Sequence, residues 1–345
     1  MLRYYLAYVI PGATMLGLAL GGGWVWLGVA QTYVMFPILD SIVPEDRGNP
    51  DPAAEPGMSA AVFYRFLTWS AVPVQIAVLV WGGFFVASPE TGLVEKIGAV
   101  LAVGIGSGGY AIVVGHELMH QRRIERWLGR ILMGSVAYAH FCIEHVQGHH
   151  VHVATPRDPA SATRGQSVYR FFVQTIIGSW RSAWAIEAAR LQRKGRPVLH
   201  PSNRMLQDAL ATVVLVVGAA ALWGWIGAVY FVGQSVVAIL ELEAINYIEH
   251  YGLRRREIAP GRYEPTDSRH SWNDSRRLTN WALFNLGRHT DHHNAAGRRY
   301  QILRHVDAAP QLPLGYAAML LIAFVPPLWR RIMDPRVDAA MGDLR

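Results

Sequence analysis

The sequence is nearly free of cysteine: Cys142 is the only one among 345 residues. One thiol cannot form an internal disulfide, and it cannot supply the four cysteines of an iron–sulfur or rubredoxin-type centre. A secreted disulfide scaffold is therefore excluded, and so is an electron-transfer centre of that kind within this chain. Cys142 lies in an apolar stretch, where we expect it to pack as a small hydrophobic side chain.

Charged residues are also scarce, at 17% of the chain. Apolar residues make up 52%, and the 33 glycines raise this share to roughly 61%, against about 45–50% in soluble proteins. Of the 32 basic residues, 13 fall in residues 121–204 and 11 in residues 250–310. This segregation is typical of a polytopic membrane protein with a basic face, and it argues against a disordered or fibrous chain. The basic residues adjoin apolar runs and form no aromatic–basic recognition motif, so nucleic acid is not an expected partner.

Apolar runs predict an all-α integral membrane protein with about six transmembrane helices. A cleaved signal peptide is a weaker interpretation of the first run, because the apolar pattern continues past any cleavage site. The run at 313–329, interrupted by two prolines, predicts a re-entrant or surface helix rather than a seventh span. The six predicted spans lie near residues 4–20, 24–43, 66–87, 94–115, 209–222 and 225–247.

Arginine density places the segments 116–204 and 248–311 on the cytoplasmic side of the inner membrane, and an even number of spans places both termini there as well. These two segments would form a helical cap on a single domain that comprises residues 1–345.

Nine of the 14 histidines gather in three clusters and one single site at the cytoplasmic ends of the predicted spans. The first cluster reads HELMH, with two histidines four residues apart, and the second reads EHVQGHH. The third, HTDHH, spaces its histidines for one helical face. The nine are His116, His120, His145, His149, His150, His250, His289, His292 and His293.

Clustering at one membrane depth predicts a multinuclear metal site, because a neutral imidazole can be buried beside hydrocarbon at a lower free-energy cost than a carboxylate. The motif HELMH also matches the zinc metalloprotease signature, with Glu117 as general base. An intramembrane protease, however, would leave at least six of the clustered histidines without a role. A metal transporter would need a polar path across the spans, whose outer halves are apolar. A soluble di-iron carboxylate bundle is excluded because it needs paired E-x-x-H motifs.

Nine imidazoles can provide four or five ligands to each of two metals and leave one position open. A nitrogen-only ligand set does not select the metal. Attack on an inert, lipid-dissolved substrate needs a metal that activates dioxygen, which favours iron over zinc.

Four segments resemble one known family. HELMH at 116–120, EHVQGHHVHVATPRDPAS at 144–161, NYIEHYGL at 246–253 and LGRHTDHH at 286–293 are similar to the motifs of the membrane-bound alkane 1-monooxygenases, within the fatty-acid hydroxylase and desaturase superfamily. The resemblance implies that the nine histidines bind two non-haem irons. It further implies oxidation of a terminal methyl group, most simply of an n-alkane to a primary alcohol, with dioxygen and with electrons from rubredoxin or a ferredoxin-type donor and its reductase.

Some residues depart from the family pattern. Gln121 follows the first motif where a lysine is usual, and Gly287 replaces a usual glutamine. Arg122, Arg123 and Glu243 are more similar to the methyl hydroxylase of xylene monooxygenase. A methyl hydroxylase of alkyl-aromatics is therefore an alternative function, followed by a lipid desaturase, which the HYGL segment disfavours.

Several acids are expected to accept the second ring N–H of a metal-binding histidine and so to fix its orientation. They are Glu249, Asp291, Asp158 and Glu144. His270 is a further candidate for a place beside the metal-binding histidines. Glu241 and Glu243, at the end of a predicted span, are candidates for this role too. Arg254, Arg255 and Arg256 follow His250 closely, and we expect them to attract an acidic electron donor or anionic lipid headgroups.

Overall fold

The computed structural model describes residues 2–342, so residue 1 and residues 343–345 of the predicted domain lie outside the described part. Nearly every element is a helix, and the one hairpin within residues 2–342 is β1–β2. In chain order the elements are η1 (Leu2–Tyr8), α1 (Val9–Leu20), η2 (Gly22–Trp26), α2 (Leu27–Ala30), η3 (Gln31–Met35), α3 (Phe36–Ile42), α4 (Glu55–Ala60), α5 (Val62–Trp69), α6 (Ala71–Ala87), α7 (Leu93–Gly106), η4 (Ser107–Ile112), α8 (Val113–Met119), α9 (Ile124–Gly134), α10 (Phe141–Glu144), η5 (His145–His149), α11 (His150–His152), α12 (Val168–Gln192), α13 (Arg204–His250), β1 (Glu257–Ala259), β2 (Arg262–Tyr263), α14 (Arg277–Ala282), α15 (His289–Asn294), η6 (Tyr300–Ile302), α16 (Tyr316–Ala323) and α17 (Pro326–Met341).

Within residues 2–342, four continuous helical segments are long and apolar enough to cross a membrane: Gly22–Ile42, Val62–Ala87, Leu93–Met119 and Arg204–His250. The first three coincide with predicted spans. The fourth contains both of the last two predicted spans, which meet at Gly224. The first predicted span, 4–20, is helical in η1 and α1 but is not among the four.

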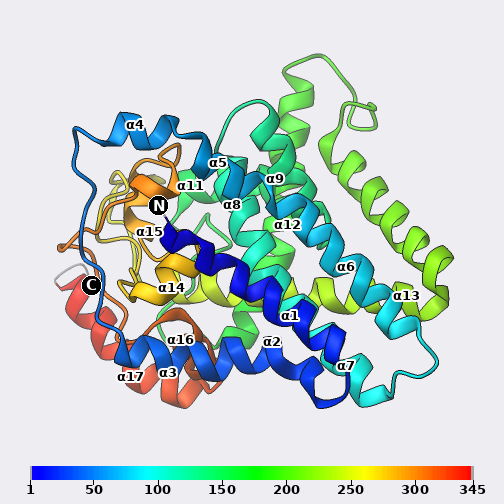
Figure 1. Cartoon of the computed structure of the whole chain (residues 1–345). Coiled ribbons are helices and arrows are strands. Elements are labelled where there is room, and N and C mark those ends of the chain that lie inside the picture. Colours follow the sequence, from blue (N-terminus) through cyan, green and yellow to red (C-terminus); the bar gives the residue numbers. More distant parts are fainter. Residues whose placement is uncertain (1, 343–345) are drawn as a thin grey trace.

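Gly224 allows the chain to change direction inside α13. Its φ of 70° and ψ of −174° are available to glycine and strained for other residues. The bend within α13, the turn between α1 and α2 and the turn between α6 and α7 all lie at one end of the molecule, at the lower right of Figure 1. The histidine-bearing helices α11 and α15 lie at the opposite end.

The segment Leu93–Met119 forms the centre of the helical assembly. In its most apolar stretch 78% of the residues are buried, whereas 6% are buried in the most apolar stretch of α13. It packs against α6 and α13. The outer helices instead expose large apolar side chains such as Leu222 and Trp225, which suits a surface that faces lipid.

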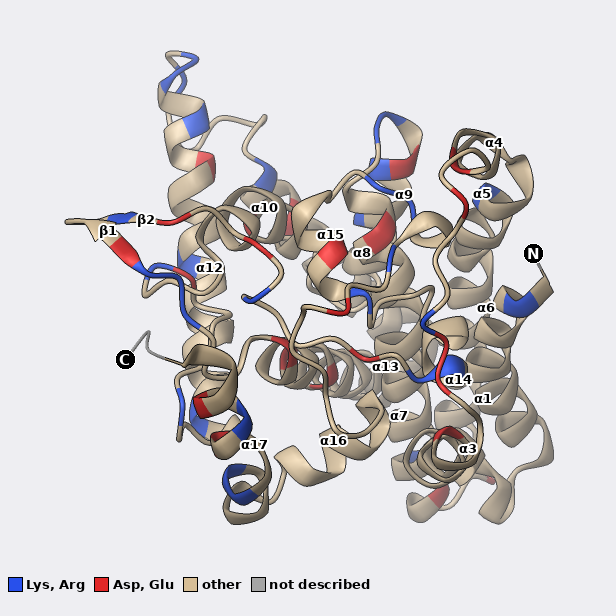
Figure 2. Cartoon of the chain, turned by 90° about the vertical axis from the view of Figure 1, so that its left-hand side faces the viewer, with Lys and Arg blue, Asp and Glu red and all other residues tan. Residues whose placement is uncertain are grey.

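Charged residues gather at the histidine end. Figure 2, which views this end, shows them on β1–β2, at the start of α9, at the end of α12 and on α17. The helix α12 belongs to the segment that we predicted to stay outside the membrane, and it carries four charged residues, Arg170, Arg181, Glu187 and Arg190.

The run at 313–329 forms the short helix α16 and the start of α17. Burial of α16 contradicts a surface helix there, whereas the other predicted form, a re-entrant helix, stays a prediction. Tyr316 and Met319 of α16 are buried, and they pack in one apolar cluster with Tyr247 and Trp329. The helix ends at Ala323 because Pro326 and Pro327 cannot continue it, and these prolines instead begin α17, where their missing N–H groups are harmless.

Candidate metal centre

The structure brings the nine clustered histidines together in two groups. The five-histidine group is His116, His120, His145, His150 and His292, and the four-histidine group is His149, His250, His289 and His293. Within each group the candidate ligand atoms lie within 4.8 Å of one another. The other five histidines, at positions 140, 152, 200, 270 and 305, belong to neither group.

The second motif divides its histidines because its helix contains a π-helical turn, η5. The four-residue spacing of His145 and His149 predicts a shared helical face, and their rings do stack, with centroids 5.1 Å apart. The wider π-helical turn, with its five-residue repeat, also brings His145 beside His150. His145 therefore joins the five-histidine group, whereas His149 belongs to the four-histidine group.

The third motif is divided as well. His289 and His293 join the four-histidine group, whereas His292 joins the other group. In an α-helix successive residues are about 100° apart around the axis, so His292 and His293 face different directions. The short helix α15 thus lies between the two groups and contributes to both.

The ring nitrogens converge as metal ligands do. The Nε2 atoms of His116 and His145 are 2.8 Å apart, and those of His150 and His292 are 3.1 Å apart. In the second group the Nε2 atoms of His289 and His250 are 3.1 Å apart. The Nε2 atoms of His120 and His149 are buried without a hydrogen-bond partner among residues 2–342. Lone pairs gathered in this way fit a metal ion at the centre of each group, since a cation would satisfy them all.

Two carboxylates contact imidazoles of the four-histidine group on the side away from its centre. Asp158 Oδ2 lies 3.0 Å from His149 Nδ1 and accepts a hydrogen bond from Ser161 Oγ. Glu249 Oε1 lies 3.2 Å from His289 Nδ1. The Tyr316 hydroxyl donates to the same oxygen at 2.6 Å. These contacts turn Nε2 of both rings toward the centre of the group.

Burial keeps most of these imidazoles neutral, as metal binding requires. It lowers the pKa of His145, His150, His292 and His293 well below the usual range, and the neighbouring imidazoles lower it further. Burial also opposes protonation of His149, but the adjacent Asp158 carboxylate outweighs it and raises the pKa of that ring.

Two other predicted supports, Asp291 and Glu144, form no hydrogen bond or ion pair with any of the nine rings among residues 2–342. Asp291 instead forms an ion pair with Arg298 at 2.6 Å, seven residues further along the chain and beyond the end of α15. Glu144 lies against Gly148, and burial followed by repulsion from Asp158 raises its pKa to about 8. His270 lies between Asp267 and Glu264, and its backbone lies beside the His250 ring. The supporting contacts predicted for Asp291 and Glu144 are therefore not seen among residues 2–342, whereas His270 does adjoin a ring of the four-histidine group.

The two acids near the end of α13 also lack histidine contacts. Glu243 accepts hydrogen bonds from the hydroxyls of Tyr138 and Thr175, at 2.8 and 2.7 Å. Glu241 receives one long contact, 3.4 Å, from the Tyr33 hydroxyl. Their proposed role as histidine partners is therefore not supported by the geometry.

The arginine triplet after His250 is only partly available to a partner. Arg255 is committed to the fold, since it donates to the carbonyls of Glu264 at 2.6 Å and Val151 at 3.0 Å. Arg254 is half-buried, whereas the Arg256 side chain is 64% exposed. Among the three, Arg256 is the residue that can meet a docking protein.

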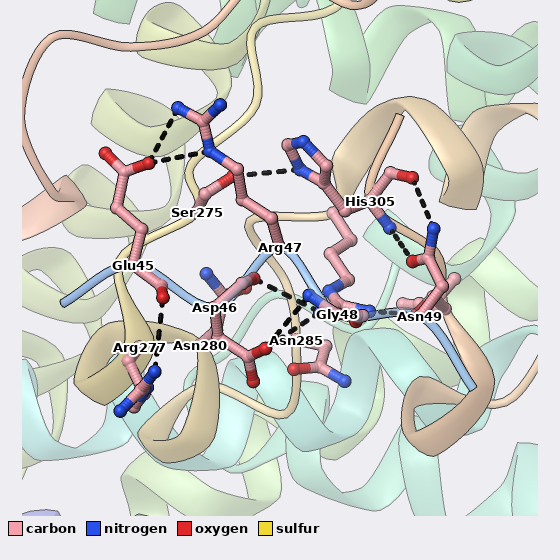
Figure 3. A network of polar contacts seen from close by, with 12 residues as sticks. Glu45, Asp46, Arg47, Gly48, Asn49, Ser275, Arg277, Asn280, Asn285 and His305 are labelled. Atoms are coloured by element: carbon pink, nitrogen blue, oxygen red, sulfur yellow. Dashed lines mark hydrogen bonds and ion pairs between the residues drawn. The ribbon is translucent and has the colours of Figure 1, made fainter. Parts of the chain in front are cut away.

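The third motif is anchored by Arg288, which directly precedes His289. Its buried guanidinium donates to the carbonyls of Leu303 at 2.6 Å and Gly48 at 2.8 Å. The segment 45–49, which includes Gly48, is held in turn by two hydrogen bonds with His305. The Asn49 side chain donates one to the His305 carbonyl and accepts the other from the His305 N–H (Figure 3). This network links the loop after α3 to the start of α15.

An apolar cavity reaches both histidine groups from the spans. Its walls come mainly from η4, α8, α13, α14 and α16, and it touches His116, His145 and His289. Tyr316 lines the same cavity. No sequence motif points to Tyr316, because its contact with Glu249 joins residues 67 positions apart.

Comparison with known proteins decides the family. The fatty acid desaturase family profile matches residues 96–323. Alkane 1-monooxygenase 2 of Pseudomonas aeruginosa is 46% identical over 92% of this chain and 85% of its own length. The chain belongs to the alkane 1-monooxygenase family. Alkane 1-monooxygenase 2 of Alcanivorax borkumensis is 43% identical over 97% of this chain and 90% of its own.

Membership of the alkane 1-monooxygenase family confirms the resemblance inferred from the four motifs. The chain is a monooxygenase-type oxidoreductase of the membrane, and its buried histidine groups have a geometry that fits metal ions. A more distant similarity extends to the hydroxylase component of xylene/toluene monooxygenase from Pseudomonas putida, at 30% identity over 95% of this chain and 86% of that protein. The xylene-type features in the sequence therefore have a counterpart among the relatives.

Proposed function

We propose that this protein is a non-haem di-iron monooxygenase that hydroxylates the terminal methyl group of n-alkanes to give primary alcohols. The observation that carries the proposal is the position of the two histidine groups beside an apolar cavity. The names and identities of the relatives support the substrate class.

The five-histidine group would hold one iron and the four-histidine group the other. Asp158 and Glu249 would orient His149 and His289 by accepting their Nδ1 hydrogens. The two irons would supply the reduction and activation of dioxygen. Two electrons would come from rubredoxin or a ferredoxin-type donor, since a chain with one cysteine holds no iron–sulfur centre.

In the overall reaction a C–H bond of the methyl group is replaced by a C–O bond. One oxygen atom of dioxygen enters the alcohol. The other takes up two protons and two electrons and leaves as water. The protein's own contribution is to hold the chain in the cavity with its methyl group toward His116, His145 and His289. The apolar walls exclude water from the reacting end.

The topology that fits this proposal has six spans in the inner membrane, with the histidine end in the cytoplasm. The break at Gly224 divides α13 into two spans, and the basic residues gather at the histidine end. Fusion reporters at residues 160 and 275 should both report a cytoplasmic location, and a periplasmic signal at either would contradict this topology.

Metal analysis combined with product analysis tests the function. The purified protein should contain about two irons and little zinc, and with a reconstituted donor system it should convert n-alkanes to 1-alkanols. The same assay should include alkylbenzenes, because the xylene-type relative favours methyl hydroxylation of aromatics as a second candidate. Benzylic alcohols as the dominant product would select that alternative, and one zinc without iron would contradict both.

A further inference from the structure

One carboxyl group in the cavity wall lacks the partners that its neighbours have. Glu241 lines the cavity and is 8% exposed. Its Oε1 atom receives the Tyr33 hydroxyl at 3.4 Å, a long contact, and Oε2 has no hydrogen-bond partner within residues 2–342. By contrast, Glu243 and Glu249 on the same helix accept hydroxyl hydrogen bonds of 2.6–2.8 Å.

The fold makes room for this carboxyl group. Gly108 of η4 lies opposite Glu241, and a Cβ atom at residue 108 would be 2.2 Å from Oε2. Any larger residue would displace the side chain from the wall. A buried polar atom without a partner destabilises a protein, and a cavity that received only hydrocarbon would never offer it one. A leucine or methionine at this position would serve a purely apolar ligand better.

The position of Glu241 relates it to the histidine end. Glu241 and Glu249 both line the cavity and are eight residues apart on α13, which corresponds to about 12 Å along a helix axis. Gly108 and His116 line the opposite wall with the same separation in sequence. The Oε2 atom that lacks a partner thus lies far enough from the histidines for an alkyl chain to extend between them.

We propose that this cavity accepts chains that carry a hydroxyl group at the end opposite the reacting methyl group, with Glu241 accepting the hydroxyl hydrogen bond. The inference rests on the proposed function, because the far end of the chain is hydroxylated there. A 1-alkanol would then give an α,ω-diol: a methyl C–H bond is replaced by C–O, the second oxygen atom of dioxygen becomes water, and the same donor provides the two electrons.

Equilibrium binding to the full-length protein in nanodiscs provides the test. The probes are radiolabelled 1-dodecanol and dodecane, and the quantity compared is the ratio of their affinities. Glu241→Met preserves chain length and removes the acceptor, so we expect this ratio to fall at least tenfold in favour of dodecane. Glu241→Gln retains one acceptor oxygen and should give a smaller change. Glu90→Gln, in the exposed turn between α6 and α7, is the matched control and should leave the ratio unchanged.

The outcomes separate this inference from the proposed function. An unchanged ratio in Glu241→Met would overturn the hydroxyl site, even if the wild-type protein hydroxylates alkanes. If both Glu241 variants bound neither 1-dodecanol nor dodecane, the hydroxyl site would also be overturned. The carboxyl group would then be needed for folding rather than for ligand binding. A wild-type protein that binds 1-dodecanol through Glu241 but oxidises neither probe would retain the site and contradict the proposed reaction. With active protein, the diol yield from 1-dodecanol should fall in Glu241→Met relative to the alcohol yield from dodecane.

Discussion

The Nε2 atoms of His145 and His150 lie 3.0 Å apart, although the two residues are five positions apart in a helix. The π-helical turn η5 makes this possible, because its hydrogen bonds span five residues rather than four. The same turn directs His149, which is adjacent to His150, to the other histidine group. Neighbouring residues therefore serve different candidate metal ions.

Double variants test this division. His150→Ala with His292→Ala removes two ligands from the five-histidine group, so about one of two irons should remain. His150→Ala with His293→Ala removes one ligand from each group, and both irons should be weakened or lost. Iron content by elemental analysis distinguishes the two proteins, and equal content would contradict the grouping. His200→Ala is the control and should keep both irons and near wild-type activity, since His200 bonds only within its own turn.

Substitution of the carboxylates tests how the rings are oriented. Glu249→Gln and Asp158→Asn should each lower metal affinity about 10- to 100-fold, because the Nδ1 partner of a binding ring is weakened. Asp291→Asn breaks an ion pair with Arg298 instead and should change affinity much less. Chelator competition measures these affinities. If Asp291→Asn lowered metal affinity as much as Glu249→Gln, closeness to the histidines would determine the change in affinity, rather than contact with a ring.

Glu187 should contribute stability that depends on pH. It is buried between Arg190 and Arg204, each 2.6 Å away, and although burial opposes its ionisation, the bonds from these arginines lower its pKa to about 2. A carboxyl group with a lowered pKa stabilises the fold above its unfolded pKa of 4.5, and this contribution is lost as the pH falls from about 5 to 2. The shift corresponds to about 3 kcal/mol, which solvent around the partly exposed arginines reduces to about 2 kcal/mol.

Thermal unfolding in detergent measures this contribution. Glu187→Gln should lower Tm at pH 7, and the difference from wild type should shrink toward pH 3. The exposed Glu90→Gln should have no such effect at either pH. A Tm difference for Glu187→Gln that stays constant over this range would assign the loss to packing rather than charge.

The arginines after His250 should separate electron-donor docking from folding. Arg256→Glu should raise KM for an acidic donor protein without a change in Tm, and higher ionic strength should raise the wild-type KM in the same way. Arg255→Ala should instead lower stability, because it removes bonds to two backbone carbonyls. Steady-state kinetics with the donor as varied substrate test both variants. An unchanged KM in Arg256→Glu would exclude this residue from the docking surface.

The clustered histidines, the apolar segments and the family could all be predicted from the sequence. Apolar runs are local, so three of the predicted spans match continuous helices, and the turn at Gly224 follows from a residue that tolerates positive φ. The four motifs are local as well, and they sufficed for the resemblance that the relatives confirm. The roles of the nine histidines as ligands and the topology remain predictions from the same patterns.

Only the tertiary structure decided how these residues are combined. Helical spacing suggested that His289, His292 and His293 act together, but their division depends on the rings that α8, η5 and α13 bring around α15. Asp291 and Glu144 lie in the motifs yet miss the imidazoles, whereas Tyr316, remote in sequence, supports Glu249. Hydrogen bonds act over about 3 Å, so their partners are set by packing between distant segments. For the same reason the unpaired carboxyl of Glu241 could be recognised only once Gly108 and Tyr33 were placed beside it.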